Sequence, residues 1–357
     1  MSLKNFLFLL LFFSHYISLA QKKDSLHVSF FFDGYVSWIP SSGKAARPPY
    51  VVNYVGLNSA GLNFLSGNLH YRHKNFRTTL GAMAGEYVQK NLISEDPVVR
   101  NIYEANIGLS IIAKENVWLD VGVLPSHIGI ETVPGFKNIT ATRNIISDIT
   151  PYYETGLRLS YAPNNKWYIA MLALNGWQRI TAPLHAIGKN WGMQIQYRPT
   201  SYMLINSSSF LGEIPEFEKI GVRRIYSNFY SIIDLNPRMQ LTLGWDWGMQ
   251  GEKAQQWNDF LMMYRYIVKD KKIFLASRLE LLSDPNRLFI GNSNMMKEAK
   301  YQMASLNIDI LPLSNLMLRT ELNYLIANQP ILQNMSFSDQ HQLSLFFILS
   351  AQLDYKK

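Results

Sequence analysis

Residues 238–250 read RMQLTLGWDWGMQ, and this stretch decides the fold class. Its odd-numbered positions carry Met, Leu, Leu, Trp, Trp and Met, whereas its even-numbered positions carry Arg, Gln, Thr, Gly, Asp, Gly and Gln. Successive side chains of a β-strand point to opposite faces of the sheet. The stretch therefore predicts a strand with one bulky, apolar face and one polar face.

The same alternation recurs along the chain, at residues 153–161, 190–198 and 343–355. A soluble sandwich with one wetted face would show the same period. The polar faces here are rich in Gly, Ser, Gln and charges of both signs, while the apolar faces are long and bulky. This pattern favours a transmembrane barrel, because its apolar residues face lipid and its polar residues face the lumen.

The composition also indicates an apolar environment outside the molecule. Only 17% of the 357 residues are charged, although 48% are hydrophobic and 13% are aromatic; soluble domains carry about 25% charged residues. The mean hydropathy of −0.06 is too polar for a bundle of membrane helices, and after the first twenty residues no apolar run approaches the ~18 residues that such a helix needs. The absence of cysteine excludes a disulfide scaffold, a Cys-ligated metal and a thiol nucleophile.

The first twenty residues have the pattern of a secretory signal peptide. A single positive charge at Lys4 precedes the apolar run 6–13, and Ser-Leu-Ala at 18–20 offers a small-x-small cleavage site. The apolar run is too short to cross ~30 Å of hydrocarbon as an anchor. We therefore expect residues 1–20 to be cleaved and residues 21–357 to form a single outer-membrane β-barrel domain.

Alternation and turn residues predict sixteen strands, joined alternately by short turns and long loops. The strands are at 26–38, 59–72, 76–87, 102–113, 117–124, 152–161, 167–176, 190–197, 202–211, 223–233, 238–249, 259–268, 273–282, 299–311, 316–325 and 341–355. The long loops are near 39–58, 88–101, 125–151, 177–189, 212–222, 250–258, 283–298 and 326–340. Both chain ends then lie on the short-turn side, as in outer-membrane barrels with short periplasmic turns and long external loops.

We predict an all-β fold, a closed antiparallel transmembrane β-barrel. Unpaired backbone N–H and C=O groups are costly in hydrocarbon, so the strand at 26–38 should pair with the strand at 341–355. Alternation is weak at 202–211, 223–233 and 259–268, which leaves fourteen or eighteen strands as alternatives. A propeller is disfavoured, because no blade-length repeat accompanies the Trp-Asp dipeptide of the opening stretch.

The middle of the chain carries a resemblance to a known family. The matching residues are Gly122–Glu131 (GVLPSHIGIE), Asn144, Ser147, Pro151–Tyr161 (PYYETGLRLSY) and Asn175–Trp177 (NGW). They resemble the OmpL-like family of β-barrel porins, which is common in the outer membranes of Bacteroidetes. The resemblance implies a barrel fold and an outer-membrane location more firmly than any particular solute. One departure is the C-terminus, where two lysines follow Tyr355, whereas such barrels often end on an aromatic residue.

Charged residues on the polar faces are the candidates for the wall of a pore. An Arg or Lys that faces lipid at mid-depth would cost ~2–4 kcal/mol, so strand parity assigns these side chains to the lumen. The pore-lining candidates are Arg77, Glu104, Asp120, Glu154, Arg158, Arg198, Asp246, Arg265, Arg278, Glu280, Arg319 and Glu321. Six arginines balance six acids, so strong ion selectivity is not expected.

The longest connection, residues 125–150, joins the fifth and sixth predicted strands. In sixteen-stranded general porins the corresponding loop folds inward and narrows the channel, and by analogy of position we expect the same here. The charges that it offers to a constriction are Glu131, Lys137, Arg143 and Asp148. An external flap packed on the rim is the alternative.

No motif for catalysis, metal binding or cofactor binding stands out. The chain lacks His-Glu-x-x-His, Gly-x-Ser-x-Gly and a glycine-rich phosphate loop. His70 and His73 are three residues apart, which puts them on opposite faces of a strand. Basic residues gather at the short turns rather than in a groove with aromatic residues, so nucleic acid is not an expected partner. We predict no cofactor, no metal and no catalytic residue, and we do not expect an enzyme.

The sequence therefore predicts a porin-like channel in the bacterial outer membrane, for passive diffusion of small hydrophilic solutes. Its expected partners are outer-membrane lipid and the solutes, and it is expected as a monomer or as a homotrimer. A plugged barrel whose loops have a structural, adhesive or partner-binding role is the first alternative. A soluble secreted β-protein is the second, and an oily interior beneath a wetted exterior would indicate it.

Overall fold

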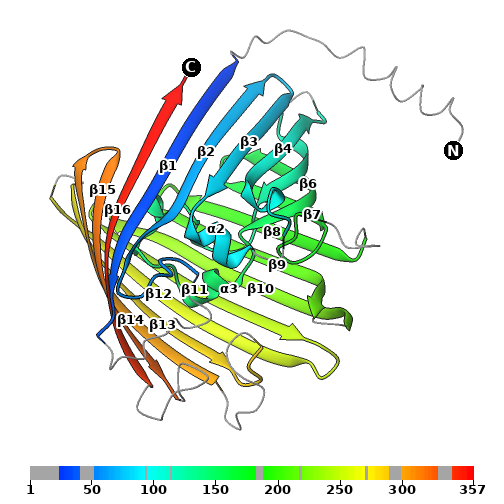
Figure 1. The fold of residues 1–357 in the computed structure, drawn as a ribbon. Coiled ribbons are helices and arrows are strands. Elements are labelled where there is room, and N and C mark those ends of the chain that lie inside the picture. Colours follow the sequence, from blue (N-terminus) through cyan, green and yellow to red (C-terminus); the bar gives the residue numbers. More distant parts are fainter. Residues whose placement is uncertain are drawn as a thin grey trace, which may run out of the picture.

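The computed structural model describes residues 24–40, 52–92, 95–112, 115–181, 188–216, 219–269, 272–288, 299–328 and 340–357. The predicted signal peptide lies outside the described residues. Within them, no helix combines the length and the hydropathy that crossing a membrane requires. The strands join side by side into one closed antiparallel barrel, in which each strand pairs with its neighbour in the sequence (Figure 1).

Sixteen strands form the barrel wall in the described part of the chain, which confirms the predicted strand number. The strands are β1 (Ser25–Trp38), β2 (Ala60–His73), β3 (Phe76–Ala84), β4 (Ile102–Ser110), β5 (Val117–Pro125), β6 (Tyr153–Asn164), β7 (Trp167–Leu174), β8 (Asn190–Thr200), β9 (Met203–Glu216), β10 (Lys219–Asn236), β11 (Met239–Gln250), β12 (Gln255–Lys269), β13 (Ile273–Asp284), β14 (Ala299–Leu313), β15 (Leu316–Ala327) and β16 (His341–Lys356). The short helical segments are α2 (Glu86–Asn91), η2 (Val99–Asn101), η3 (Gly135–Lys137) and α3 (Ile145–Ile149).

The barrel closes between its first and last strands, as predicted. β1 pairs antiparallel with β16 in continuous register, from His27 opposite Lys356 to Trp38 opposite Leu345. In Figure 1 the blue first strand lies beside the red last strand, and the chain enters and leaves the barrel at the same end. Closure gives every strand two neighbours, so no row of unpaired backbone groups faces the hydrocarbon.

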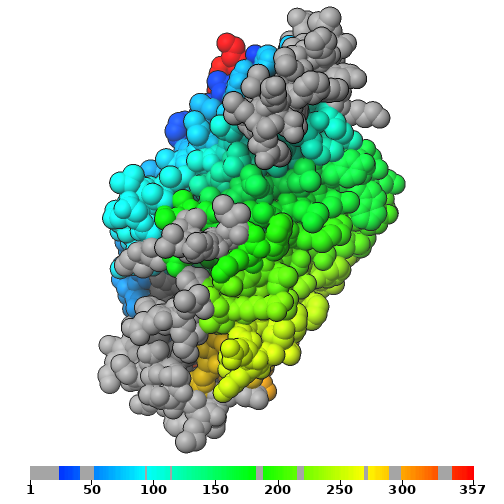
Figure 2. Space-filling view, turned by 90° about the vertical axis from the view of Figure 1, so that its right-hand side faces the viewer, coloured from blue at the N-terminus to red at the C-terminus, as the bar shows by residue number. Residues whose placement is uncertain are grey.

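The two faces of each strand differ as the alternation predicted, and β13 illustrates the difference. Leu275, Leu279 and Leu281 point outward and are 43–51% exposed, whereas Arg278 and Glu280 point inward and are at most 1% exposed. Figure 2 shows the outer wall, where the green to yellow strands form one continuous surface. The apolar face therefore lies outside and the polar face inside, which is the reverse of a soluble β-protein.

The third predicted strand extended to residue 87, and this boundary is wrong. β3 ends at Ala84, and α2 follows. Between them Gly85 has a φ of +118°, and a Cβ at this position would approach the Asn63 carbonyl oxygen to 2.5 Å. Tyr87 is buried, with its ring 5.6 Å from the ring of Phe64. The helix forms because the lumen offers Tyr87 an apolar contact, which strand periodicity does not reveal.

Two of the predicted long loops, at 212–222 and 250–258, are short connections. β9 and β10 continue until only residues 217–218 separate them, and the turn between β11 and β12 contains only residues 251–254. A membrane-spanning strand needs ~9–11 residues, whereas β10 has 18. Backbone pairing continues beyond the hydrocarbon, where the outer face need not be apolar, so alternation alone missed these extensions.

We predict that an outward-facing charge destabilises the barrel according to its depth. Leu279→Arg, at the middle of β13, should lower the free energy of unfolding in lipid vesicles by about 2–4 kcal/mol. Leu275→Arg lies on the same face near the short turn and should lower it by about 0–1 kcal/mol. Denaturant titration of the refolded barrels, with heat-dependent gel mobility as the test of folding, measures both. Equal losses would contradict a lipid-facing outer surface.

Candidate functional site

The lumen of the barrel is the candidate site, and all of the predicted pore-lining residues lie on its side of the strands. Twelve charged side chains occupy inward-facing positions, namely Arg77, Glu104, Asp120, Glu154, Arg158, Arg198, Asp246, Arg265, Arg278, Glu280, Arg319 and Glu321. The strand register and the inward-folded connections then bring them into separate groups.

One group gathers three predicted residues from β3, β5 and β6. The Asp120 carboxylate accepts hydrogen bonds from Arg77, at 2.6 and 2.7 Å, and from Arg158, at 3.2 Å. The register of β5 against β6 places Asp120 opposite Arg158. The Arg77 guanidinium also lies 4.3 Å from the centre of the Trp118 ring. The Asp120 side chain is 1% exposed, whereas those of Arg77 and Arg158 are 31% and 17% exposed, so positive charge faces the lumen.

The connection between β5 and β6, residues 126–152, enters the barrel, and we call it the inner loop. Its first residues contact the strands that follow β6. The carbonyl oxygen of His127 accepts hydrogen bonds from Gln194 of β8, at 3.1 Å, and from Ser208 of β9, at 2.7 Å. These two partners lie on the inward face of their strands, so the inner loop packs against the inside of the wall rather than over the rim.

Arg319 of β15 holds the middle of the inner loop. Its guanidinium donates hydrogen bonds to the carbonyl oxygens of Gly135, Asn138 and Ile139, at 2.8, 3.0 and 3.2 Å. The same group forms two bonds of 2.9 Å to the carboxylate of Asp309 on β14. Arg319 is fully enclosed, and its charge is balanced by Asp309 while its remaining donors bind the loop backbone. A buried charge requires such partners.

Arg278 and Glu321, from β13 and β15, both bind Thr142 of the inner loop, and Arg278 also donates to the Thr140 hydroxyl at 2.9 Å. The Glu321 carboxylate accepts hydrogen bonds from the backbone N–H and the hydroxyl of Thr142, both at 2.6 Å. Arg278 donates to the carbonyl oxygen of Thr142 at 2.6 Å and to its Oγ1 at 2.9 Å. Arg278 and Glu321 also form an ion pair at 3.5 Å, so the wall and the loop form one hydrogen-bonded unit.

Glu280 of β13 binds the first turn of α3, which lies within the inner loop (Figure 1). One carboxylate oxygen accepts hydrogen bonds from the backbone N–H groups of Ile145 and Ile146, at 2.6 and 3.3 Å. The side chain of Asn144 caps the same turn by accepting a bond of 2.7 Å from the Ser147 N–H. The free N–H groups of the helix start are thus satisfied, one set by the barrel wall and one by the loop itself.

The four loop charges predicted for a constriction have different environments. Glu131 is buried and accepts hydrogen bonds of 2.7 and 2.8 Å from the backbone and side chain of Asn144. Arg143 and Asp148 are buried together and form an ion pair at 3.4 Å. Lys137 is exposed and lines a cavity at the short-turn end. Glu131, Arg143 and Asp148 therefore form contacts within the inner loop, whereas Lys137 faces open space.

Burial has opposite effects on two titratable groups of the inner loop. It raises the pKa of Glu131, against the attraction of Arg278 for the ionised carboxylate. Burial lowers the pKa of His127, but the ion pair and hydrogen bond with Glu154 outweigh it, so the pKa of His127 lies above its usual value. The two ring nitrogens of His127 face acceptors, the Glu154 carboxylate at 2.7 Å and the Ser209 carbonyl oxygen at 2.8 Å. The protonated imidazolium therefore fits this position.

Several charged residues of the lumen were missed at the sequence level. They are Asp33, Arg224, Asp259, Asp284 and Asp309, all of them buried. Strand parity could have identified them; Asp309, for example, lies between the outward-facing Ile308 and Ile310. Their omission left Arg319 without its ion-pair partner in the prediction.

A second segment from the loop after β1 also reaches the lumen, and no sequence signal predicted it. The backbone N–H of Val52 donates to Asp148 of the inner loop at 3.0 Å. The ring of Tyr54 lies 5.3 Å from that of Tyr35 and 5.9 Å from that of Phe346. This segment packs the inner loop against β1 and β16, so the two connections support each other.

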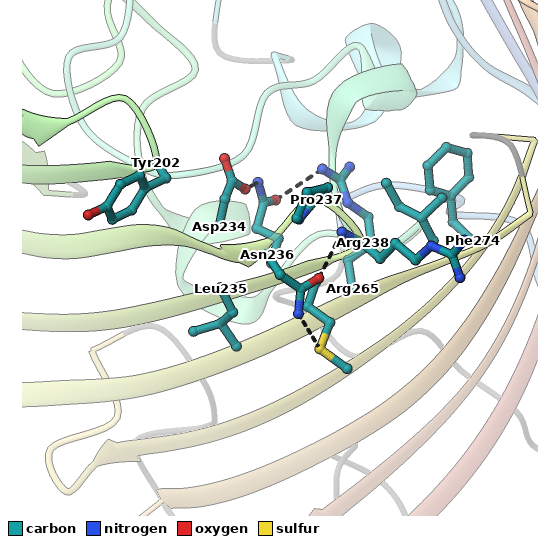
Figure 3. Close-up of a pocket in the computed structure, with 11 residues that line it drawn as sticks. Tyr202, Asp234, Leu235, Asn236, Pro237, Arg238, Arg265 and Phe274 are labelled. Carbon is teal, nitrogen blue, oxygen red and sulfur yellow. Dashed lines mark hydrogen bonds between the residues drawn. The ribbon is translucent and has the colours of Figure 1, made fainter.

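Open space remains at the short-turn end of the lumen. One cavity of about 840 Å³ is lined by Asp234, Gln240 and neighbouring turn residues (Figure 3). A second, of about 1010 Å³, is lined by Lys137 of the inner loop together with residues of β16. Arg265 and Phe274 line both cavities. Arg265 therefore stands where the two spaces meet.

We predict that Arg319→Gln loosens the inner loop. The change removes donors to three loop carbonyls and leaves Asp309 buried without its partner, a loss of ~3–5 kcal/mol in comparable buried pairs. Trypsin should then cleave folded barrels after Lys137, whereas the unsubstituted barrel should resist. Arg198→Gln is the control, because within the described residues Arg198 shares no hydrogen bond or ion pair with the inner loop. Equal cleavage of both variants would show that Arg319 does not anchor the loop.

Comparison with known proteins agrees with this geometry. The chain is similar in fold to the anion-selective porin from Comamonas acidovorans, with a TM-score of 0.60 and 8% identity over 93% of this chain and 100% of that chain. It is also similar to the outer membrane channel DcaP of Acinetobacter baumannii, with a TM-score of 0.61 and 7% identity over 94% and 99%. No curated protein matches the chain in sequence. At these identities the structural likeness concerns the fold alone.

The sequence itself matches a family model along almost the whole barrel. The family is described as "Putative beta-barrel porin-2, OmpL-like", and the match covers residues 25–352. The matched segment begins in β1 and ends in β16, so it includes the inner loop and the strands that bind it. The chain therefore belongs to the OmpL-like β-barrel porin family, and it is a porin-like barrel of the bacterial outer membrane.

Proposed function

We propose that the barrel is a passive channel for small hydrophilic solutes, with the inner loop as its constriction. The observation that carries the proposal is the combination of an apolar outer wall with a charged lumen that keeps open cavities. A hydrated wall of fixed charges suits solutes that cross by diffusion. Diffusion needs no cofactor and no catalytic residue, so we propose neither for this chain.

The proposed path follows the part of the wall that the inner loop leaves uncovered. The loop covers Arg278 and Arg319, which are at most 2% exposed. Arg77 and Arg158 keep exposed surface, and Arg265 borders both cavities. A solute would therefore pass these three arginines, between the loop and the uncovered wall.

A plugged barrel is the second candidate, and the close fit of the inner loop against the wall favours it. Glu280 and Glu321 are completely buried beneath the loop, which is hydrogen-bonded to the inward faces of β13 and β15. If the lumen were filled along its whole circumference, the barrel would conduct no solute. Its outer loops would then carry the function, in a structural, adhesive or partner-binding role. Purified protein in planar bilayers separates the two functions, because a plugged barrel gives no steady channels.

Our proposal for the whole chain includes its export and its surroundings. We propose cleavage of residues 1–20, a single barrel domain over residues 21–357, and outer-membrane lipid around the wall. The barrel would act alone or as a homotrimer, without nucleic acid as a partner. The exposed leucines of β13 argue against a soluble secreted protein, because water would not stabilise such a surface.

We predict that removing the centre of the inner loop widens the channel. Deletion of residues 132–146 should raise the single-channel conductance in planar bilayers, because the hydrogen-bonded block along β13 to β15 is lost. The wall residues it covers are charged, so water can replace the loop without unfolding the barrel. Heat-dependent gel mobility should confirm that the variant folds. A folded variant with unchanged conductance would exclude the inner loop as the constriction.

We also predict that the mature protein begins at Gln21. The cleavage pattern ends at Ala20, and the first strand begins at Ser25. Intact-mass measurement of protein purified from outer membranes should give the mass of residues 21–357. A mass that includes residues 1–20 would contradict cleavage at this site.

A further inference from the structure

Acidic and basic side chains of the lumen differ in their exposure, although their numbers balance in the sequence. Among the twelve wall residues, five of the six acids are at most 3% exposed, and the sixth, Glu104, is half-buried. Four of the six arginines keep exposed surface, and these are Arg77, Arg158, Arg198 and Arg265. Among these twelve residues, the charge that keeps exposed surface is therefore mainly positive.

The buried acids form hydrogen bonds with other groups of the protein. Glu280 and Glu321 bind backbone groups of the inner loop, and Glu154 binds His127. Asp246 accepts a hydrogen bond of 2.5 Å from Asn228. A permeating ion responds to the fixed charges that line its path, so these enclosed carboxylates contribute less than the exposed arginines.

Arg265 has the most direct position on the proposed path. It borders both cavities at the short-turn end, and Lys137 lines one of them from the inner loop. Its guanidinium donates a hydrogen bond of 3.1 Å to Gln240 and lies 5.9 Å from the centre of the Phe274 ring. Figure 3 shows Arg265 beside the turn that carries Asn236 and Pro237. Within the described residues it forms no ion pair with a carboxylate.

Two exposed acids line the cavities at this end of the barrel, and both have other partners. The basic side chains that line the two cavities are Lys137, Arg238 and Arg265, so they outnumber the two acids. Asp234 accepts a hydrogen bond of 2.7 Å from Gln240. Asp354 lies 2.8 Å from His27. Neither carboxylate forms an ion pair with Arg265 in the described part of the chain, although Asp234 and Asp309 attract its charge over a longer distance. Arg265 keeps exposed surface and borders both cavities. A guanidinium at the border of a hydrated cavity attracts carboxylates, phosphates and halides.

We propose that the channel prefers small anions and that Arg265 is the residue that determines this preference. The proposal rests on the passive channel proposed above and names the class of solute. The sequence, with six arginines and six acids among the pore-lining candidates, predicted no strong ion selectivity. The proposal differs because the exposure of each charged side chain, and not the number of each sign, decides which charges a permeating ion meets. Arg77 of β3 and Arg158 of β6 add charge of the same sign, since both pair with the single buried carboxylate of Asp120.

The test is the reversal potential of single channels in a potassium chloride gradient. The unsubstituted barrel should show an anion-to-cation permeability ratio above one. Arg265→Gln should lower the ratio by about twofold to threefold, as expected for one unit charge several ångströms from the path. Arg265→Lys keeps the charge and should keep the ratio, whereas Arg265→Glu should lower it further. Lys166→Gln is the matched control, because Lys166 is exposed in the turn between β6 and β7.

Each outcome bears on a different part of the proposal. A ratio of one or below in the unsubstituted barrel overturns the anion preference while the passive channel stands. A ratio above one that Arg265→Gln leaves unchanged overturns the role of Arg265. Absence of any channel in the unsubstituted barrel overturns both the channel and its selectivity. Heat-dependent gel mobility of each variant separates a lost charge from a misfolded barrel.

Discussion

The need to satisfy every backbone hydrogen bond in hydrocarbon governs the rest of this structure. A sheet in lipid can meet it only by closing, and here β1 pairs with β16 along its length. Closure turns one face of every strand toward lipid and the other toward an enclosed space. The first face must be apolar, and the second is free to carry charge. The alternation of apolar and polar residues at 238–250 follows from this constraint.

The enclosed space imposes a second requirement, because a charge without water needs a partner. Strands β13 to β15 place Arg278, Arg319, Glu280 and Glu321 on the inward face, and the inner loop supplies backbone groups to each of them. A buried charge that loses its partner is strongly destabilising. The wall charges therefore hold the loop in place, and the loop backbone supplies the partners that these charges need where water is excluded.

The inner loop covers some of the charged residues of the lumen and leaves others exposed, so these residues fall into two classes. The charged side chains beneath the inner loop have a structural role, because they form hydrogen bonds to the loop backbone and ion pairs with one another. Those on the uncovered wall keep contact with water, and Arg265 is placed where two cavities meet. Counting charged residues cannot distinguish the classes. The sign of the accessible charge follows from which part of the wall the loop covers.

Strand number, closure and the inward parity of the twelve charged residues were determined by the sequence, because alternation is local and each strand encodes its own two faces. Parity also encoded Asp309, although it was overlooked. The tertiary structure alone decided that Thr142 meets Arg278 and Glu321, that α2 interrupts the course of β3, and which charges remain exposed. These features depend on contacts between residues more than a hundred positions apart or on apolar burial inside the lumen. A period of two residues carries no information about such contacts.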